Sequence, residues 1–123
     1  MFECNLPWPP SVNSYYTVWK GRKILSKKGK QFKADCSIYI YRNGPQLTGD
    51  LSVEISVCMP DKRRRDLDNL LKPILDVLGN YGVYEDDSQI VDLRIKKIDA
   101  NKGDVVVKIK RLMEKDNVQN TNR

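Results

Sequence analysis

An apolar stripe across residues 67–78 limits the architectures that this 123-residue chain can adopt. Leucine and isoleucine recur there at spacings of three and four residues, at Leu67, Leu70, Leu71, Ile74, Leu75 and Leu78. Such spacing is typical of an amphipathic helix with one buried face. Pro73 lies inside the stripe and lacks a backbone donor, so we expect a kink or an irregular first turn. Gly79 or Gly82 is expected to end the helix.

The segment that precedes the stripe has a different period. Its apolar residues occupy every second position, at Leu51, Val53, Ile55, Val57 and Met59. A period of two predicts a strand with one face in the core. Shorter alternating runs at 2–6, 91–95 and 105–109 predict further strands. Residues 15–19 and 23–25 flank Gly21 and predict a hairpin.

A second helix is expected to begin after Ser26, because serine is a good N-cap residue. Its apolar positions have helical spacing, at Phe32, Cys36, Tyr39 and Ile40, and its expected stop is Asn43, Gly44 and Pro45. Strands and helices mix without a regular alternation, so we predict an α+β fold, a mixed β-sheet packed by two helices. We expect one small domain over 1–113, followed by a polar, frayed tail over 114–123.

The composition removes much of the catalytic repertoire, because the chain has no histidine. This excludes Ser-His-Asp and Cys-His triads, histidine-ligated zinc and imidazole bases. The chain has 22 lysines and arginines against 16 acids, and its net charge of +6 favours a polyanionic partner such as nucleic acid. A hydrolase of this composition needs carboxylates, lysine, tyrosine or a metal held by oxygen ligands.

The cysteines indicate a reducing compartment. Cys4, Cys36 and Cys58 have no CxxC spacing and lie among apolar residues, as small buried side chains do. No stretch approaches 18 apolar residues, and the N-terminus lacks the basic and apolar regions of a signal peptide. We therefore expect a cytoplasmic protein without a membrane partner.

A basic run leads directly into an acidic pair at the start of the 67–78 helix. The run consists of Lys62, Arg63, Arg64 and Arg65. Asp66 follows at the helix entrance, Asp68 lies on the polar side, and Lys72 lies one turn after Asp68 on the same face. An ordinary structural interpretation stays open, in which Asp66 caps the helix and Asp68 pairs with Lys72 at the surface.

A second acidic cluster, Glu85-Asp86-Asp87, lies between this helix and the next strand. Taken alone, it is typical of a solvated turn. A helix followed by a returning strand can bring Asp87 beside Asp66, and three carboxylates repel one another unless a cation lies among them. Mg²⁺ suits such a site because it prefers oxygen ligands and retains waters, with Mn²⁺ as a substitute. The basic run would then hold a phosphodiester against a metal that activates water.

These motifs together resemble the RusA family of Holliday junction resolvases. The resemblance covers residues 5 to 112 and rests on four segments: Leu6-Pro7-Trp8-Pro9-Pro10-Ser11 with Asn13, Tyr15 and Tyr16; Met59-Pro60-Asp61 with the basic run; Asp66-Leu67-Asp68-Asn69-Leu70 with Lys72; and Asp86-Asp87-Ser88-Gln89-Ile90. It implies a Mg²⁺-dependent endonuclease that resolves four-way junctions by paired symmetric nicks with 5′-phosphate products. It also implies a homodimer on branched DNA, whose two-fold symmetry suits the junction.

The resemblance implies roles for individual residues as well. The family's metal-binding and catalytic aspartates correspond to Asp66, Asp68 and Asp87, and its essential lysine corresponds to Lys72. Asp86 corresponds to a position that is often acidic and is a further candidate acid. No small-molecule cofactor is expected beside the metal.

Cations elsewhere in the chain favour a DNA-binding surface. Residues 20–33 hold seven cations and no acid: Lys20, Arg22, Lys23, Lys27, Lys28, Lys30 and Lys33. Solubility does not require so many, so we expect phosphate contacts from Lys27, Lys28 and Lys30, from the basic run and from Asn69.

Several residues keep two interpretations. Tyr15, Tyr16 and Trp19 either stack on unpaired bases or occupy ordinary half-buried strand positions. Asp76 and Asp92 are interpreted as ordinary polar-face residues. Two other functions also stay open, a related nuclease for forks or flaps and a basic nucleic-acid-binding protein without catalysis. A pure binder gains nothing from acids beside phosphates, which favours a nuclease.

Overall fold

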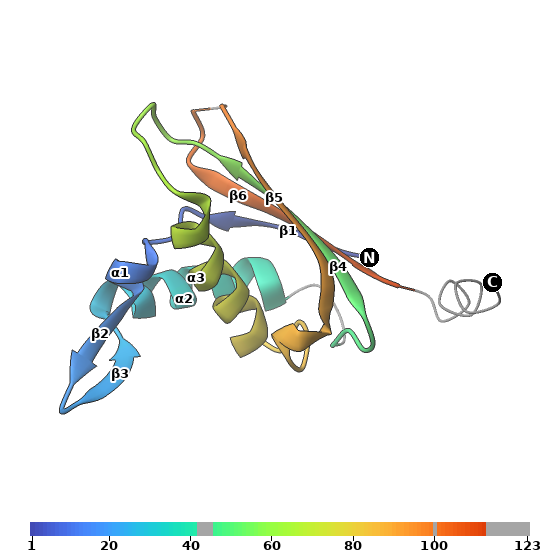
Figure 1. The fold of residues 1–123 in the computed structure, drawn as a ribbon, viewed down its shortest axis with the longest axis horizontal. Coiled ribbons are helices and arrows are strands. Elements are labelled where there is room, and N and C mark those ends of the chain that lie inside the picture. The colour runs from blue at the N-terminus through green and yellow to red at the C-terminus, as the bar shows by residue number, and fades with distance from the viewer. Residues whose placement is uncertain (42–45, 100, 113–123) are drawn as a thin grey trace.

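The computed structural model describes residues 1–41, 46–99 and 101–112 (Figure 1). Its elements in chain order are β1 (Phe2–Pro7), α1 (Val12–Tyr15), β2 (Tyr16–Trp19), β3 (Arg22–Leu25), α2 (Lys27–Tyr41), β4 (Leu51–Cys58), α3 (Leu67–Asn80), the 3₁₀ helix η1 (Asp87–Gln89), β5 (Ile90–Ile98) and β6 (Asp104–Arg111). The predicted tail, 114–123, and the predicted helix stop at Asn43, Gly44 and Pro45 lie outside the described residues. None of the described helices has the length and apolar character needed to cross a membrane.

A four-stranded mixed sheet with the order β1-β6-β4-β5 forms the centre of the molecule (Figure 1). β6 is antiparallel to β1 and β4, whereas β4 and β5 are parallel. The parallel pair follows from connectivity, because α3 carries the chain from the end of β4 back to the start of β5. β2 and β3 form a separate antiparallel hairpin. The predicted α+β fold, its mixed sheet and its hairpin are confirmed.

The core lies between one face of this sheet and the two long helices, α2 and α3 (Figure 1). On β4 the side chains of Leu51, Val53, Ile55 and Val57 are buried, while the intervening side chains are only half-buried. α3 buries the apolar stripe, with Leu70, Ile74 and Leu78 in the core. The apolar face of β4 and the apolar stripe of α3, both predicted from the sequence, therefore pack in one core. Burial of these side chains stabilises the domain.

β5 lies at the edge of the sheet, which leaves much of its apolar surface exposed. Leu93 and Ile95 pair with Val53 and Ile55 and share their face, but Leu93 is 39% exposed. Val91 is 57% exposed because the register shifts beside it, where Ile90 and Asp92 pair with consecutive residues of β4. The predicted common face of this strand thus holds for Leu93 and Ile95 only.

The structure adds a short helix that the periodicity did not predict. α1 follows the proline-rich loop and ends at Tyr15, whose ring is fully buried against Tyr16 and Phe32. Ser26 caps α2 as predicted, because its hydroxyl oxygen accepts a hydrogen bond of 3.0 Å from the Gly29 N–H.

α3 runs from Leu67 to Asn80 without interruption, although Pro73 lies inside it. The proline ring is buried, so the residue contributes to the core while removing one backbone donor. Gly82 takes a φ of +74° just after the helix end, a conformation that glycine adopts without strain. The helix thereby ends between the two glycines that the sequence offered as stops.

Candidate active site along helix α3

Two of the predicted acids lie at the entrance of α3. Asp66 occupies the N-cap position with extended backbone (φ −90°, ψ 132°), and its side chain makes no capping hydrogen bond. Asp68 lies in the first turn, and both side chains are exposed. The helix N-terminus favours negative charge here, but neither carboxylate is used as a cap. Both are therefore available to a ligand, and the interpretation of Asp66 as an ordinary cap is not supported.

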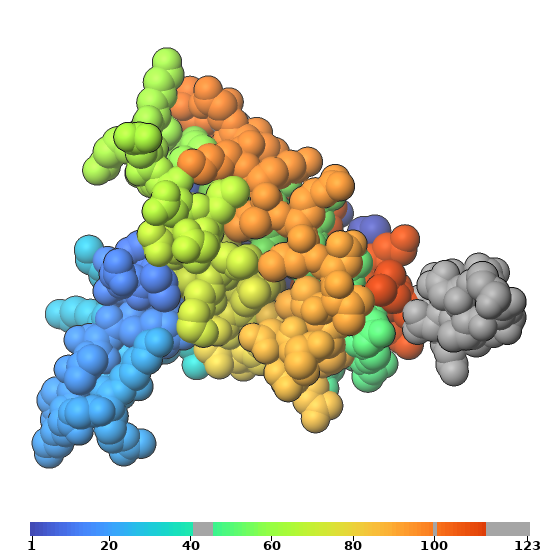
Figure 2. Space-filling model, viewed as in Figure 1, coloured from blue at the N-terminus to red at the C-terminus, as the bar shows by residue number. Residues whose placement is uncertain are grey.

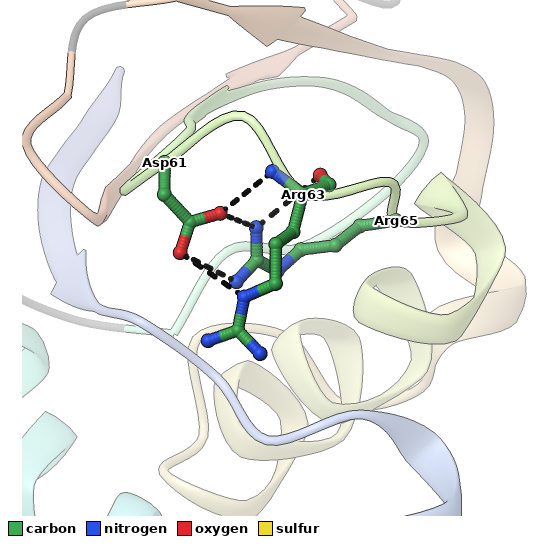
Figure 3. Close-up of polar contacts among 3 residues, drawn as sticks. All are labelled: Asp61, Arg63 and Arg65. Carbon is green, nitrogen blue, oxygen red and sulfur yellow. Dashed lines mark hydrogen bonds and ion pairs between the residues drawn. The ribbon is translucent and has the colours of Figure 1, made fainter.

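The loop in front of these acids is held by one carboxylate (Figure 3). Asp61 accepts hydrogen bonds from both terminal nitrogens of Arg65, at 2.6 and 3.2 Å, and from the Arg63 N–H at 2.9 Å. The Arg63 Nε lies 3.5 Å from the same carboxylate. Together these contacts, led by the Arg65 hydrogen bonds, hold the pKa of Asp61 well below its ordinary value. Asp61 thus folds the basic run back onto itself immediately before Asp66.

Arg65 is consequently a poor candidate for direct phosphate binding. Its guanidinium is engaged by Asp61 and lies 5.2 Å from the centre of the Trp8 ring, and its side chain is 19% exposed. A guanidinium that pairs with a carboxylate and makes a cation–π contact with an indole is well ordered. Arg65 therefore joins the N-terminal loop to the helix entrance, while Lys62 and Arg64 stay exposed.

A hollow of about 490 Å³ opens beside Asp66, and we call it the entrance hollow. It is lined by Trp8, Ser11, Arg64, Arg65, Asp66 and Asn69, together with Pro9 and Leu70. The N-terminal loop, the basic run and the first turn of α3 all contribute to it. Four residues predicted from the sequence for catalysis or DNA binding thereby meet on one concave surface.

Lys72 does not pair with Asp68, as the ordinary surface interpretation required. Its Nζ lies 3.4 Å from Oδ1 of Asp76, one turn further along the helix. The Tyr16 hydroxyl donates a hydrogen bond to the other oxygen, Oδ2, of Asp76. Asp76 is therefore not the ordinary polar-face residue that the sequence suggested, because it links α3 to the start of β2.

The third predicted acid lies near the opposite end of α3. Asp87 is exposed in η1 and lines a hollow of about 270 Å³ with Asp76, Tyr84, Glu85 and others, which we call the Asp87 hollow. Burial, and then the charge of Asp87, raise the pKa of Asp76 above its ordinary value. Burial and the same two carboxylates also raise the pKa of Tyr84, whose hydroxyl donates to the Leu75 carbonyl at 2.6 Å.

Asp86, the further candidate acid, has a structural partner. It caps η1 by accepting a hydrogen bond from the Ser88 N–H at 3.3 Å, while its own N–H donates to the Gln89 side chain at 3.0 Å. Hydrogen bonds from Ser88 lower the pKa of Asp86. The capping box fixes the turn that presents Asp87.

The three predicted aspartates do not form one cluster in a single chain. Asp66 is the N-cap of α3 and Asp68 lies in its first turn, whereas Asp87 lies by Asp76, which is about 12 Å beyond Asp68 along the helix at 1.5 Å per residue. In the described part of the chain, no three acidic or cysteine side chains are close enough together to hold a metal. Oxygen donors of the kind that Mg²⁺ prefers are present at both places, and Mg²⁺ needs only one or two carboxylates beside water and phosphate.

The predicted basic surface is exposed. Lys27, Lys28 and Lys30 lie in the first turn of α2, where the helix dipole disfavours cations, so these lysines do not serve helix stability. The β2–β3 hairpin stands away from the body (Figure 2) and carries Trp19, which is 60% exposed with the Lys20 Nζ 4.6 Å from its ring centre. Trp19 stays available for stacking, but the stacking interpretation of Tyr15 is wrong because its ring is buried.

Sequence reasoning missed four residues of this region: Trp8, Tyr16, Asp61 and Asp76 as side chains that organise the predicted acids and Lys72. One signal was present, because Asp76 follows Lys72 by four residues, the spacing of a helical ion pair. The contacts of Trp8 and Tyr16 join distant segments, so no local pattern predicts them.

Similarity to known proteins identifies the family of this chain. The family model described as endodeoxyribonuclease RusA matches residues 7–110. The chain belongs to the RusA family. It is 40% identical to proteins named crossover junction endodeoxyribonuclease RusA from Escherichia coli strain K12, Shigella sonnei and Enterobacteria phage 82. Each alignment covers 83% of this chain and 87% of the relative. The resemblance drawn from the sequence motifs is confirmed.

Proposed function

We propose that the protein is an endodeoxyribonuclease that resolves four-way DNA junctions with the help of Mg²⁺. Its RusA relatives are named for crossover junctions, which supports the substrate class. The observation that carries the proposal is the entrance hollow. There the Asp66 carboxylate makes no capping hydrogen bond to the helix and lines the same surface as Arg64 and Asn69. A carboxylate next to the exposed Arg64 guanidinium would suit the binding of Mg²⁺ together with a phosphodiester.

In this proposal Asp66 at the N-cap and Asp68 in the first turn of α3 would hold the metal, and Asp87, which lines the other hollow, is the third acid that the reaction needs. Mg²⁺ held there, or Mn²⁺ in its place, would supply Lewis-acid activation of a water and of the scissile phosphate. Lys62 and Arg64 bind the DNA backbone, and Arg63 and Arg65, held by Asp61, shape the loop that presents them. Hydrolysis leaves a 5′-phosphate.

Lys72 has a different task in the same reaction. An ammonium fixed near the scissile phosphate stabilises the extra negative charge of the transition state or assists the leaving oxygen. Asn69, which lines the entrance hollow, contacts the backbone of the DNA. A homodimer places two such sites on one junction, which suits paired symmetric nicks.

The test is a cleavage assay on a labelled four-way junction, fork, flap and linear duplex. We expect Asp66→Asn, Asp68→Asn and Asp87→Asn each to abolish cleavage of the junction while binding of the junction survives. Lys72→Ala should lower the single-turnover rate by roughly 10²-fold or more. The matched control is Asp92→Asn, because Asp92 accepts a hydrogen bond from Ser52 on β4 and lines neither hollow.

The outcomes separate the alternatives. Cutting of forks or flaps in preference to the junction would replace the proposed substrate with the related one. Binding without metal-dependent cleavage would support the non-catalytic interpretation. Near-parental cleavage by all three aspartate variants would refute the site assignment. Mn²⁺ binding to each variant, followed by electron paramagnetic resonance, shows which acids hold the metal and which act elsewhere.

A further inference from the structure

Asp76 is the point at which α3 is joined to the start of β2. Its Oδ1 lies 3.4 Å from the Lys72 Nζ, and its Oδ2 accepts the hydrogen bond of the Tyr16 hydroxyl. The Asp76 side chain is 21% exposed, against 51% for Lys72. Both carboxylate oxygens are thus engaged, one by an ammonium and one by a phenol from another element.

The direction of the ion pair is informative. Lys72 has an acid one turn before it, Asp68, and another one turn after it, Asp76. In an isolated helix the pair with the acid on the N-terminal side is the better one, which favours Asp68. The structure has the reverse pair, because Tyr16 fixes Asp76 and the Lys72 Nζ also lies 5.9 Å from the Tyr16 ring centre.

This choice has two consequences for the face of α3. The Lys72 ammonium is held between the acids of the first turn and the Asp87 hollow, which Asp76 also lines. The Asp68 carboxylate is left without an ion pair in the described part of the chain. A lysine side chain is flexible, so without this contact its charge would sample many positions, including one on Asp68.

We propose that Asp76 is a positioning residue, anchored by Tyr16, that holds the Lys72 ammonium for catalysis and keeps it away from Asp68. This inference rests on the proposed function, in which Lys72 acts on the scissile phosphate and Asp68 holds the metal. Asp76 itself touches neither the DNA nor the reacting atoms in this scheme. Its effect on the reaction passes through Lys72.

The first test is a double-mutant cycle on single-turnover cleavage of a four-way junction at saturating protein. We expect Asp76→Asn to lower the rate about 10-fold with junction affinity unchanged, and to have no further effect in the Lys72→Ala background. Asp76→Glu should recover part of the rate. The matched control is Asp35→Asn, because Asp35 accepts a 2.8 Å hydrogen bond from Gln31 at the same spacing on α2.

The second test does not need cleavage. Mn²⁺ binding, followed by electron paramagnetic resonance, should weaken severalfold in Asp76→Asn and return to the parental affinity in Asp76→Asn/Lys72→Ala. Tyr16→Phe, which keeps the ring and removes only the hydroxyl, should change both readouts in the same direction and by less. Melting followed by circular dichroism establishes that each variant is folded.

The outcomes distinguish the two proposals. Cleavage by the parent with additive effects of the two substitutions, or with no effect of Asp76→Asn, would overturn the positioning role. A parent that cuts none of the branched substrates would refute the proposed function. In that case unchanged Mn²⁺ affinity in Asp76→Asn would still refute the separation of Lys72 from Asp68.

Discussion

Gly29 has unusually little space around it, which makes Gly29→Ala a sharp test of how α1 and α2 pack. A Cβ atom at this position would lie 2.3 Å from the Tyr15 carbonyl oxygen, whereas ordinary contacts begin at 3.4 Å. The same oxygen accepts a hydrogen bond of 2.9 Å from the Ser26 N–H. The added methyl group therefore forces the two segments apart by about 1 Å or breaks that hydrogen bond.

The expected change in stability has the opposite sign to the one that helix propensity alone predicts. Replacing glycine with alanine inside a helix gains about 1 kcal/mol through helix propensity. Overpacking costs about 1–3 kcal/mol, and loss of the Ser26 hydrogen bond costs about 1 kcal/mol more. We therefore expect Gly29→Ala to lower the free energy of unfolding by about 1–3 kcal/mol. Tyr15 is the neighbour of Tyr16, so a shift of Tyr15 should also weaken the hydrogen bond from the Tyr16 hydroxyl to Asp76.

Urea unfolding followed by circular dichroism measures this change, with the slope m showing whether the transition stays comparable. The chain provides a matched control in Gly79 of α3, where a Cβ atom would meet only the Tyr84 ring at 3.4 Å. Gly79→Ala should therefore raise the free energy of unfolding by up to about 1 kcal/mol. A Gly29→Ala protein as stable as the parent, or more stable, would refute the packing argument.

Two further predictions concern charge. Replacing Lys27, Lys28 and Lys30 together with glutamine should reduce the slope of log affinity against log salt by about 2.7 if each lysine contacts one phosphate of a duplex arm, and an unchanged slope would place this face away from DNA. Hydrogen bonds from Arg65 and Arg63 hold the pKa of the Asp61 carboxyl below its value in the unfolded chain. The stability that these contacts give to the folded state is therefore complete above about pH 4 and is lost as the pH falls further. The Tm of Asp61→Asn should accordingly depend less on pH below 4 than the parental Tm, and parallel curves would contradict this.

The regular elements were predictable because their signals are local. The alternation from Leu51 to Val57 and the stripe from Leu67 to Leu78 depend only on which face of a strand or helix is buried, and both are confirmed. The cap at Ser26 is local in the same sense, since its partner lies three residues away. The four motif segments, two of which contain Asp66 and Asp87, were together sufficient to indicate the RusA family.

Relations between distant segments depended on the tertiary structure. Tyr15 is buried because α1 places its ring against Phe32 of α2. Lys72 pairs with Asp76 because Tyr16, which precedes Asp76 by 60 residues, fixes that carboxylate. Asp87 lies near the far end of α3 because the parallel pairing of β4 and β5 sets where the chain returns. Local periodicity specifies which side of an element is buried, but it contains no information on which other element supplies the partner. Those partners are chosen by packing across the whole core.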